Sequence, residues 1–171
     1  MSARPALLLL ACLLGPRPAT AEVVSAGPSG FVVRTESVTA RDLAAAWQRL
    51  VRVQQWWSQE HTYSGDAANL SLQLTPGGCW CEKLPGRGFV RHMEVVYVAP
   101  RHTLRLVGGL GPLQGMGAAG ALTFTLKPMG PGQTTVTAEY AVSGYVPGGF
   151  GELAAAVDGV LSEQLRRYAA R

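Results

Sequence analysis

The chain has 171 residues and a modest positive charge, with 15 Lys and Arg residues against 11 Asp and Glu, which gives a formal net charge of +4 at pH 7. Its arginines are scattered and form no basic stripe, which excludes the electrostatic footprint of a nucleic-acid-binding domain. Hydrophobic residues make up 47% of the chain, enough for one domain of this length to bury a core. The composition predicts a single domain and no nucleic-acid partner.

The N-terminal segment has the three parts of an export signal. Arg4 supplies a positive charge, residues Pro5 to Leu14 form a short apolar region, and Ala19-Thr20-Ala21 is a small-x-small cleavage site. The apolar region is too short to span a membrane, which takes roughly 20 residues. We expect residues 1–21 to be a signal peptide cut after Ala21, so that the mature protein is periplasmic or secreted.

A lipobox-like Leu-Leu-Ala-Cys sequence ending at Cys12 offers a second interpretation of this segment, as the signal of a lipoprotein. The apolar Leu13 and Leu14 after Cys12, and the cleavage site ending at Ala21, favour cleavage without lipidation. Removal of 21 of the 171 residues leaves 150 and takes away two of the 15 basic residues, so that 13 face 11 acidic ones. No later segment is apolar over a membrane-spanning length, so no stable membrane span is expected.

After the signal, the sequence has the patterning of short strands. We expect residues 22–30 to be a flexible lead-in, because Gly27, Pro28 and Gly30 interrupt it. Seven segments have the period-two or β-branched pattern of strands, and they are residues 31–38, 70–74, 79–84, 89–99, 103–107, 122–127 and 134–143. Short turns between successive strands predict an antiparallel sheet.

Two segments have the spacing of amphipathic helices. The first runs to about Val51, with Thr39 as its predicted N-cap and Asp42 three residues on, and a short helical turn from Val53 to Trp57 follows it. In the C-terminal segment seven apolar residues fall on one stripe: Phe150, Leu153, Ala154, Val157, Leu161, Leu165 and Tyr168. This helix can cover the apolar face of the sheet. The pattern predicts an α+β helix-grip fold, in which a curved antiparallel sheet of about six to seven strands wraps around the C-terminal helix.

The order of these elements resembles the START-like, or SRPBCC, superfamily. Three local patterns carry the resemblance: the Trp56-Trp57 pair after the first helix, the Gly-Gly turn of residues 76–80, and the strand of residues 90–100 with its closing proline. The chain is most similar to the branch of heat-shock-protein ATPase activators and polyketide cyclases. The runs 61–70, 79–82 and 110–113 resemble an exported bacterial subgroup of it.

The resemblance implies one START-like domain over residues 31–171, with a hydrophobic cavity between the sheet and the C-terminal helix. It does not fix an activity. A small hydrophobic or lipid-like ligand is the implied partner, and pockets for such ligands are mostly apolar with a few convergent polar groups. The candidate ligand-binding residues are Trp56, Trp57, Tyr63, His92, Glu94, Tyr97 and Tyr140. The two tryptophans also suit core packing, so both roles stay open for them.

His92 and Glu94 alternate onto one face of their predicted strand and are the candidate catalytic residues. In an apolar pocket this pair could act as a general base and its orienting partner. Facing solvent, it would be a surface pair of little consequence. The sequence leaves both open, because residues 95–98 are apolar on both faces.

Three functions follow from these residues. The first is an exported protein that binds a hydrophobic ligand. The second is a cyclase, dehydratase or isomerase that uses His92 and Glu94 on a polyketide- or steroid-like substrate; the sequence shows no catalytic triad, metal spacing or cofactor loop for it. The third is a chaperone-activating interaction module, which export would separate from a cytosolic chaperone. We expect a binding protein, with no cofactor and with any protein partner unidentified.

Cys79 and Cys81 are the cysteines left after signal removal. One residue apart in a strand, they share a face with Cα atoms about 6.5 Å apart, at the limit of disulfide geometry. This favours free or packed thiols on the core face over a strained disulfide or an intermolecular bridge. Cys-x-Cys is not the usual zinc spacing, and Trp80 and Glu82 point away from the thiols, so we expect no metal site.

Residues 108–117 are rich in glycine but lack a phosphate-binding pattern. Such a loop suits a mobile gate over the cavity.

Overall fold

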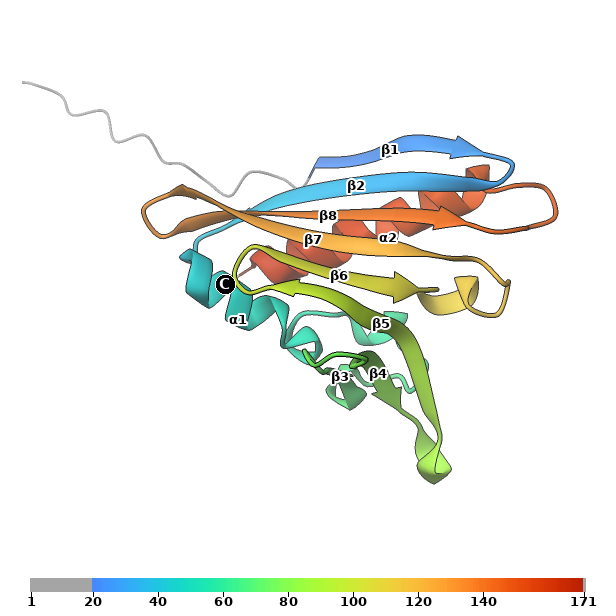
Figure 1. Cartoon of the computed structure of the whole chain (residues 1–171), viewed down its shortest axis with the longest axis horizontal. Helices are drawn as coiled ribbons and strands as arrows, with labels where there is room; N and C mark the ends of the chain where they lie inside the picture. The colour runs from blue at the N-terminus through green and yellow to red at the C-terminus, as the bar shows by residue number, and fades with distance from the viewer. Residues whose placement is uncertain (1–19, 171) are drawn as a thin grey trace, which may run out of the picture.

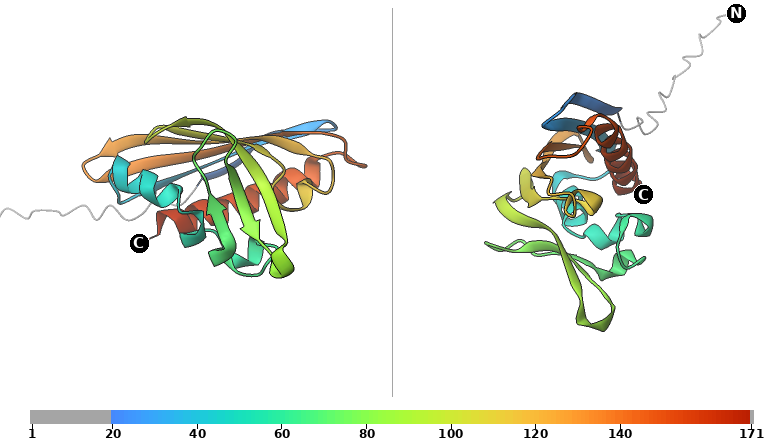
Figure 2. Two further views of the ribbon diagram at one scale, coloured as in Figure 1. Left: turned by 60° about the horizontal axis from the view of Figure 1, so that its bottom comes forward. Right: turned by 90° about the vertical axis from the view of Figure 1, so that its right-hand side faces the viewer.

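The computed structural model describes residues 20–170, with the side chains of residues 22–170. The expected signal peptide lies outside the described residues apart from the backbone of Thr20 and Ala21. The chain has the predicted α+β helix-grip architecture: one curved antiparallel sheet with a long C-terminal helix along one face (Figures 1 and 2). No helix within the described part of the chain is long and apolar enough to cross a membrane.

The sheet has eight antiparallel strands in the order β1-β2-β8-β7-β6-β5-β4-β3. The strands are β1 Thr20–Gly27, β2 Gly30–Thr39, β3 Leu70–Leu72, β4 Cys79–Lys83, β5 Phe89–Ala99, β6 Thr103–Gly108, β7 Ala119–Gly130 and β8 Gln133–Ser143. The predicted seven strands are all present, and the additional one is β1. The six strands from β3 to β8 are neighbours in chain order, and β2, from the beginning of the chain, pairs with β8 near its end.

Strand β1 corrects the expectation that residues 22–30 are a flexible lead-in. It pairs with β2 from Thr20↔Glu36 to Gly27↔Gly30. The glycines and proline that suggested an irregular segment instead form the turn of this hairpin. Gly30 is required there, because a Cβ at this position would overlap the carbonyl oxygen of Val142 on the neighbouring β8.

The helices are α1 Leu43–Leu50 and α2 Gly151–Ala169, with short 3-10 turns η1 Val53–Gln55, η2 Gln59–His61, η3 Ala67–Asn69, η4 Pro85–Arg87 and η5 Gly111–Leu113. The predicted N-cap Thr39 is wrong, because it ends β2 and pairs with Thr134 of β8. Asp42 caps α1 instead, its side chain accepting a hydrogen bond from the Ala45 amide at 2.8 Å.

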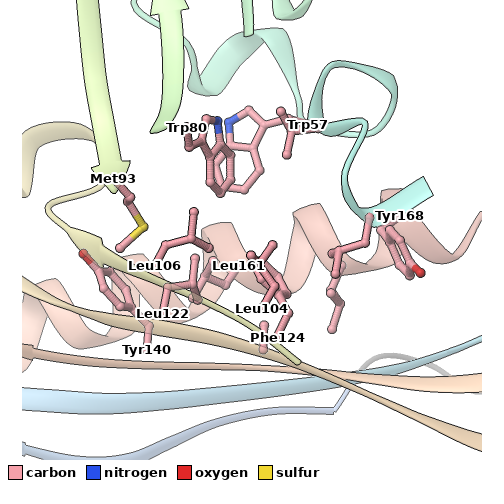
Figure 3. Close-up of a cluster of buried hydrophobic side chains, with 14 of the residues drawn as sticks. Trp57, Trp80, Met93, Leu104, Leu106, Leu122, Phe124, Tyr140, Leu161 and Tyr168 are labelled. Carbon is pink, nitrogen blue, oxygen red and sulfur yellow. The ribbon is translucent and has the colours of Figure 1, made fainter. Parts of the chain in front are cut away.

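The core lies between the sheet and the two helices. Figure 3 shows the leucine layer from β6 and β7 lying against α2, with Tyr140 and Tyr168 at its two ends. The buried side chains of this layer are Leu104 and Leu106 of β6 and Leu122 and Phe124 of β7. On the side of α2, the buried leucines are Leu161 and Leu165. Tyr168 is buried as well, and its hydroxyl donates to the carbonyl oxygen of Ala46 at 2.7 Å, which joins the end of α2 to α1.

Two arginines, Arg41 just before α1 and Arg49 within it, hold the C-terminal end of α2. Arg49 donates from Nε to the Tyr168 carbonyl at 2.8 Å and from Nη2 to the Arg167 carbonyl at 3.1 Å. Arg41 donates from Nη2 to the Ala170 carbonyl at 3.0 Å. The last carbonyls of a helix lack partners within it, and cations are also favoured there by the helix dipole. These bonds therefore fix the position of α2 over the sheet.

Candidate ligand-binding pocket

A pocket of about 420 Å³ opens between α2 and two loops. One loop contains η2 and connects α1 to β3, and the other contains η5 and connects β6 to β7. The lining residues are Trp57, Glu60, His61, Thr62, Tyr63, Leu110, Gly111, Pro112, Leu113, Leu153, Ala156, Val157, Val160 and Leu161. None of them belongs to a strand, so this pocket lies beside the helix, whereas core side chains fill the space between the helix and the sheet.

The wall from α2 is entirely apolar. Leu153, Val157 and Val160 are only partly buried, and Ala156 is exposed. Leu161 is buried and belongs to both the core and the pocket wall. Helix α2 therefore has an apolar surface broader than the stripe that packs on the sheet, and its additional part faces the pocket.

The loop around η2 is held to α2 by two polar contacts. The amide of Ser58 donates to Oε1 of Gln164 at 2.7 Å, and Nε of Arg167 donates to the carbonyl of Trp56 at 3.0 Å. Within the loop, Nε1 of Trp57 donates a hydrogen bond to the carbonyl of His61 at 2.9 Å. One side of the pocket is thus fixed to the helix that forms the opposite wall.

Tyr63 joins the two loops across the pocket. Its hydroxyl donates to the carbonyl oxygen of Gly111 at 2.9 Å, and 54% of the residue remains exposed. Its ring lies 5.9 Å from the ring of His92, measured between centroids. Tyr63 therefore stands between the pocket and the buried histidine.

Glu82 of β4 and His92 of β5 form a buried pair behind Tyr63. Nε2 of His92 lies 2.9 Å from Oε2 of Glu82, and 6% and 0% of the two side chains are exposed. The Glu82 carboxylate also accepts hydrogen bonds from the amides of Tyr63, at 3.1 Å, and of Ser64. One carboxylate thus connects two strands of the sheet with the loop that lines the pocket.

The surroundings of this pair fix its protonation. Burial alone would raise the pKa of Glu82, but the hydrogen bonds from Ser64, Tyr63 and His92 favour the ionised form, and the net pKa lies below its usual value. Burial lowers the pKa of His92, and the contact with Glu82 offsets only part of this effect. At neutral pH the pair is therefore a carboxylate and a neutral imidazole. Because an ionised carboxylate only accepts, Nε2 carries the imidazole proton and Nδ1 is left as an acceptor.

A smaller cavity of about 20 Å³ reaches His92 of this pair. Its lining residues are Trp57, His61, Leu70, Trp80, His92, Leu110 and Gly111. The first two of these and the last two also line the larger pocket. The small cavity is therefore next to the inner end of the pocket.

The structure places Trp57 and Tyr63 on the wall of the larger pocket and His92 on that of the smaller cavity, as described above. Trp56 belongs to the core instead, with 2% of its surface exposed and its Nε1 donating to the Leu50 carbonyl at 3.2 Å. Tyr140 is also buried and lies beneath the η5 loop. Its hydroxyl donates to the Gly108 carbonyl at 2.8 Å and accepts from the Leu110 amide at 3.2 Å.

Glu94 and Tyr97 lie outside the pocket. Glu94 forms an ion pair with Arg91 at 3.2 Å on the solvent side of the sheet. Tyr97 is 50% exposed, with the guanidinium of Arg105 5.7 Å from its ring centroid. The prediction that His92 and Glu94 share one face of their strand is therefore wrong.

A β-bulge explains this error. Trp80 of β4 lies opposite Met93, but the next residue, Cys81, lies opposite Arg91, so that His92 is an extra residue in β5. Both His92 and Met93 are consequently buried, and the strict alternation that placed Glu94 beside His92 is lost.

Sequence reasoning missed Glu82 as the partner of His92, and it missed the pocket residues of α2. Parity in β4 had already placed Glu82 on the same face as Trp80, opposite the cysteines. A carboxylate on the face of a strand that also carries a tryptophan is the signal that could have identified a buried acid.

The two cysteines form a disulfide, contrary to the expectation of free thiols. Their Cα atoms are 5.4 Å apart, closer than the roughly 6.5 Å of a regular strand. Trp80 and Glu82 are buried while both cysteines are partly exposed, so the disulfide lies on the outer face of β4 and not on the core face.

Neither a protein-family model nor a curated protein matches the chain. Solved structures do. A conserved protein of unknown function, EF2215 from Enterococcus faecalis, is 17% identical with a TM-score of 0.60, covering 88% of this chain and 74% of that one. CalU16 from Micromonospora echinospora, in its solution NMR structure, is 13% identical with a TM-score of 0.56, covering 94% and 75%. MLL2253 from Mesorhizobium loti is 18% identical with a TM-score of 0.54, covering 81% and 93%. At this level of identity the likeness establishes the fold alone: the chain shares a helix-grip fold with these three proteins.

Proposed function

We propose that this protein binds a small apolar or amphipathic ligand in the pocket between α2 and the loops of η2 and η5. The pocket carries the proposal: its volume of about 420 Å³ lies in the range of roughly 300–1,000 Å³ that is usual for ligand sites. Its inner wall is apolar, while Glu60, His61 and Thr62 supply polar groups from one loop. This combination suits a ligand with an apolar body.

The apolar surface of α2 supports the same conclusion. Leu153, Val157 and Val160 are already partly buried by the loops but not covered by the sheet. A contiguous apolar surface left in a concavity marks a binding site more often than a surface patch of no consequence. A ligand in the pocket would bury these side chains fully.

A pair of substitutions in α2 tests the proposal. Ala155 and Ala156 are both exposed, but only Ala156 lines the pocket. Ala156→Trp places an indole in the pocket, whereas Ala155→Trp places the same side chain on the solvent face of the helix. The measurement is a fluorescence titration with N-phenyl-1-naphthylamine, an uncharged hydrophobic probe.

We expect Ala156→Trp to weaken probe binding at least tenfold and Ala155→Trp to leave it within twofold of the unmodified protein. Equal affinities in all three proteins would mean that the probe binds elsewhere, and an absence of binding to the unmodified protein would contradict the proposal. Native mass spectrometry of protein purified from its own source would then identify the ligand that it carries.

We also propose that the protein is a START-like domain and that it is exported after cleavage of its signal peptide. Cleavage after Ala21 would start the mature chain at Glu22, which pairs with Arg34, so that β1 would keep its pairing from Glu22 to Gly27. The intact mass of protein from the periplasm or the medium tests this. A mass that begins at Glu22 is expected, and an uncleaved chain in the cytosol would contradict export.

The buried pair of Glu82 and His92 favours a second candidate function, general-base catalysis. The geometry replaces Glu94 with Glu82 as the residue that orients His92. The ring opening of 5-nitrobenzisoxazole, which reports a base in an apolar site, is a suitable probe reaction. Catalysis that is lost in His92→Phe and kept in Glu94→Gln would support the candidate, and equal rates in both variants would reject it.

A further inference from the structure

Trp80 has a buried hydrogen-bond donor with nothing to receive it. Only 1% of this residue is exposed, and within residues 20–170 its Nε1 has no hydrogen-bond partner. Figure 3 shows the nitrogen atoms of Trp80 and Trp57 on the side of the indoles that faces away from the leucine layer. Trp57 uses its nitrogen to bind His61, which lines the small cavity together with both indoles. Trp80 itself also lines the small cavity.

His92 provides an acceptor at the same cavity. Its Nε2 donates to Glu82, so Nδ1 of the neutral ring is an acceptor. The hydrogen bonds of the described residues use only Nε2 of this ring. The rings of Trp80 and His92 are 6.3 Å apart between centroids, and both residues line the small cavity.

The size of the small cavity limits what can bind there. Its volume is about 20 Å³, and about 10–15 Å³ suffices for one water molecule. One oxygen atom therefore fits. Within the described part of the chain no Lys or Arg lines either cavity, and the ionised Glu82 lies directly behind His92. An anionic end group would therefore be repelled.

The two groups also specify the chemistry of this oxygen. A carbonyl oxygen would accept from Trp80 but leave Nδ1 without a donor, and an ammonium would face the Trp80 N–H with another donor. A hydroxyl accepts from the one and donates to the other. We propose that the pocket selects ligands with an apolar body and a single inner hydroxyl group, a phenol or alcohol, which binds between Trp80 and His92.

This inference rests on the proposed function, and its test separates the two. The probes are 2-naphthol and 2-methylnaphthalene, which have the same shape but differ in a hydroxyl or a methyl group, and 2-naphthoate, which carries an anion. Their dissociation constants are measured at pH 7.5 by quenching of tryptophan fluorescence, for the unmodified protein and for Ala156→Trp.

We expect 2-naphthol to bind at least tenfold more tightly than 2-methylnaphthalene, although it is the less hydrophobic compound, because a methyl group in the small cavity leaves both polar groups unpaired. 2-Naphthoate should bind at least tenfold more weakly than 2-naphthol. The preference for the hydroxyl should fall to about twofold in His92→Phe or Trp80→Phe and persist in Glu94→Gln, which lies on the solvent side.

Equal binding of 2-naphthol and 2-methylnaphthalene, with both weakened by Ala156→Trp, would overturn the hydroxyl selection and leave the proposed function standing. A failure of all three compounds to bind, or binding that ignores Ala156→Trp, would contradict the proposed function itself. The comparison in the unmodified protein is decisive even if neither His92→Phe nor Trp80→Phe folds.

Discussion

Nε2 of His92 lies 2.9 Å from Oε2 of Glu82, in the interior between the sheet and the pocket. The same carboxylate binds the amides of Tyr63 and Ser64, so the pair links the sheet to the loop that carries the pocket wall. A buried carboxylate needs such donors, because an unpaired charge in the interior is costly. The stability of the fold and the geometry of the pocket therefore depend on one set of contacts.

The stability of the protein should fall in acid in two steps. His92 has a pKa below its unfolded value of 6.5, so the unfolded chain takes up a proton first and stability declines as the pH drops below about 6.5. Glu82 has a pKa below its unfolded value of 4.5, so its contribution is present above that value and is lost as the pH falls through the folded pKa. Urea unfolding at pH 7.5, 5.5 and 4.0 measures both steps.

Glu82→Gln should remove the second step and lower the free energy of unfolding at pH 7.5 by about 1–3 kcal/mol, because the amide cannot accept all the hydrogen bonds that the carboxylate accepts. Glu94→Gln, on the solvent side, is the matched control and should behave as the unmodified protein. A Glu82→Gln protein with unchanged stability at every pH would show that the buried pair does not form.

Tyr63→Phe should speed ligand release. The substitution removes the hydrogen bond from the Tyr63 hydroxyl to Gly111, which holds the two loops together across the pocket. A hydrogen bond of this kind contributes about 0.5–1.5 kcal/mol, which corresponds to roughly a two- to tenfold faster dissociation. Stopped-flow displacement of N-phenyl-1-naphthylamine measures the rate. Tyr97→Phe, on the outer face of the sheet, is the control, and equal rates in both variants would mean that this bond does not restrain the pocket.

The disulfide should add little to stability. It closes a loop over a sequence separation of only 2, so the loss of unfolded-state entropy stabilises the fold by only about 1–2 kcal/mol. A Cys79→Ser, Cys81→Ser double variant should therefore fold and unfold at slightly lower urea concentration. Thiol titration of the denatured, unreduced mature protein should find no free thiol, and two free thiols per chain would contradict the disulfide.

Arg49→Met should destabilise the protein by about 1–2 kcal/mol, because two carbonyls at the end of α2 lose their donors. Methionine keeps a comparable apolar stem, so that packing is largely retained. Arg52→Met changes an exposed arginine three residues further along, beyond the end of α1, and should alter stability by less than about 0.5 kcal/mol. Thermal unfolding followed by circular dichroism compares the two, and an equal effect would show that the bonds to α2 contribute nothing.

Periodicity was sufficient to predict most of the fold. The alternation of Leu122, Phe124 and Leu126 indicated β7, and the spacing of Leu161, Leu165 and Tyr168 indicated the buried face of α2. Strand β1 escaped prediction because its pattern is weak and its turn contains Pro28, which was interpreted as part of an irregular segment. Residues 20–27 form a strand because they pair with β2, and the sequence of the segment itself does not reveal that pairing.

The site was less predictable, because it depends on where strict alternation fails. The bulge that inserts His92 into β5 separates it from Glu94 and turns it towards Glu82. Bulges have no reliable signature in a single sequence. The pocket wall was hidden for another reason: Val157 and Leu161 were correctly placed on an apolar stripe, but the stripe does not tell which part of it faces the sheet and which part a loop leaves open.

The location of the ligand is measured most directly by nuclear Overhauser effects between a bound probe and the methyl groups of the protein. With 2-naphthol bound, we expect cross-peaks from its ring protons to the methyl groups of Val157, Val160 and Leu110, which line the pocket. Val96 and Val107 are exposed elsewhere on the sheet. Cross-peaks to these two residues alone, or no cross-peaks to any of the five residues, would contradict ligand binding in this pocket.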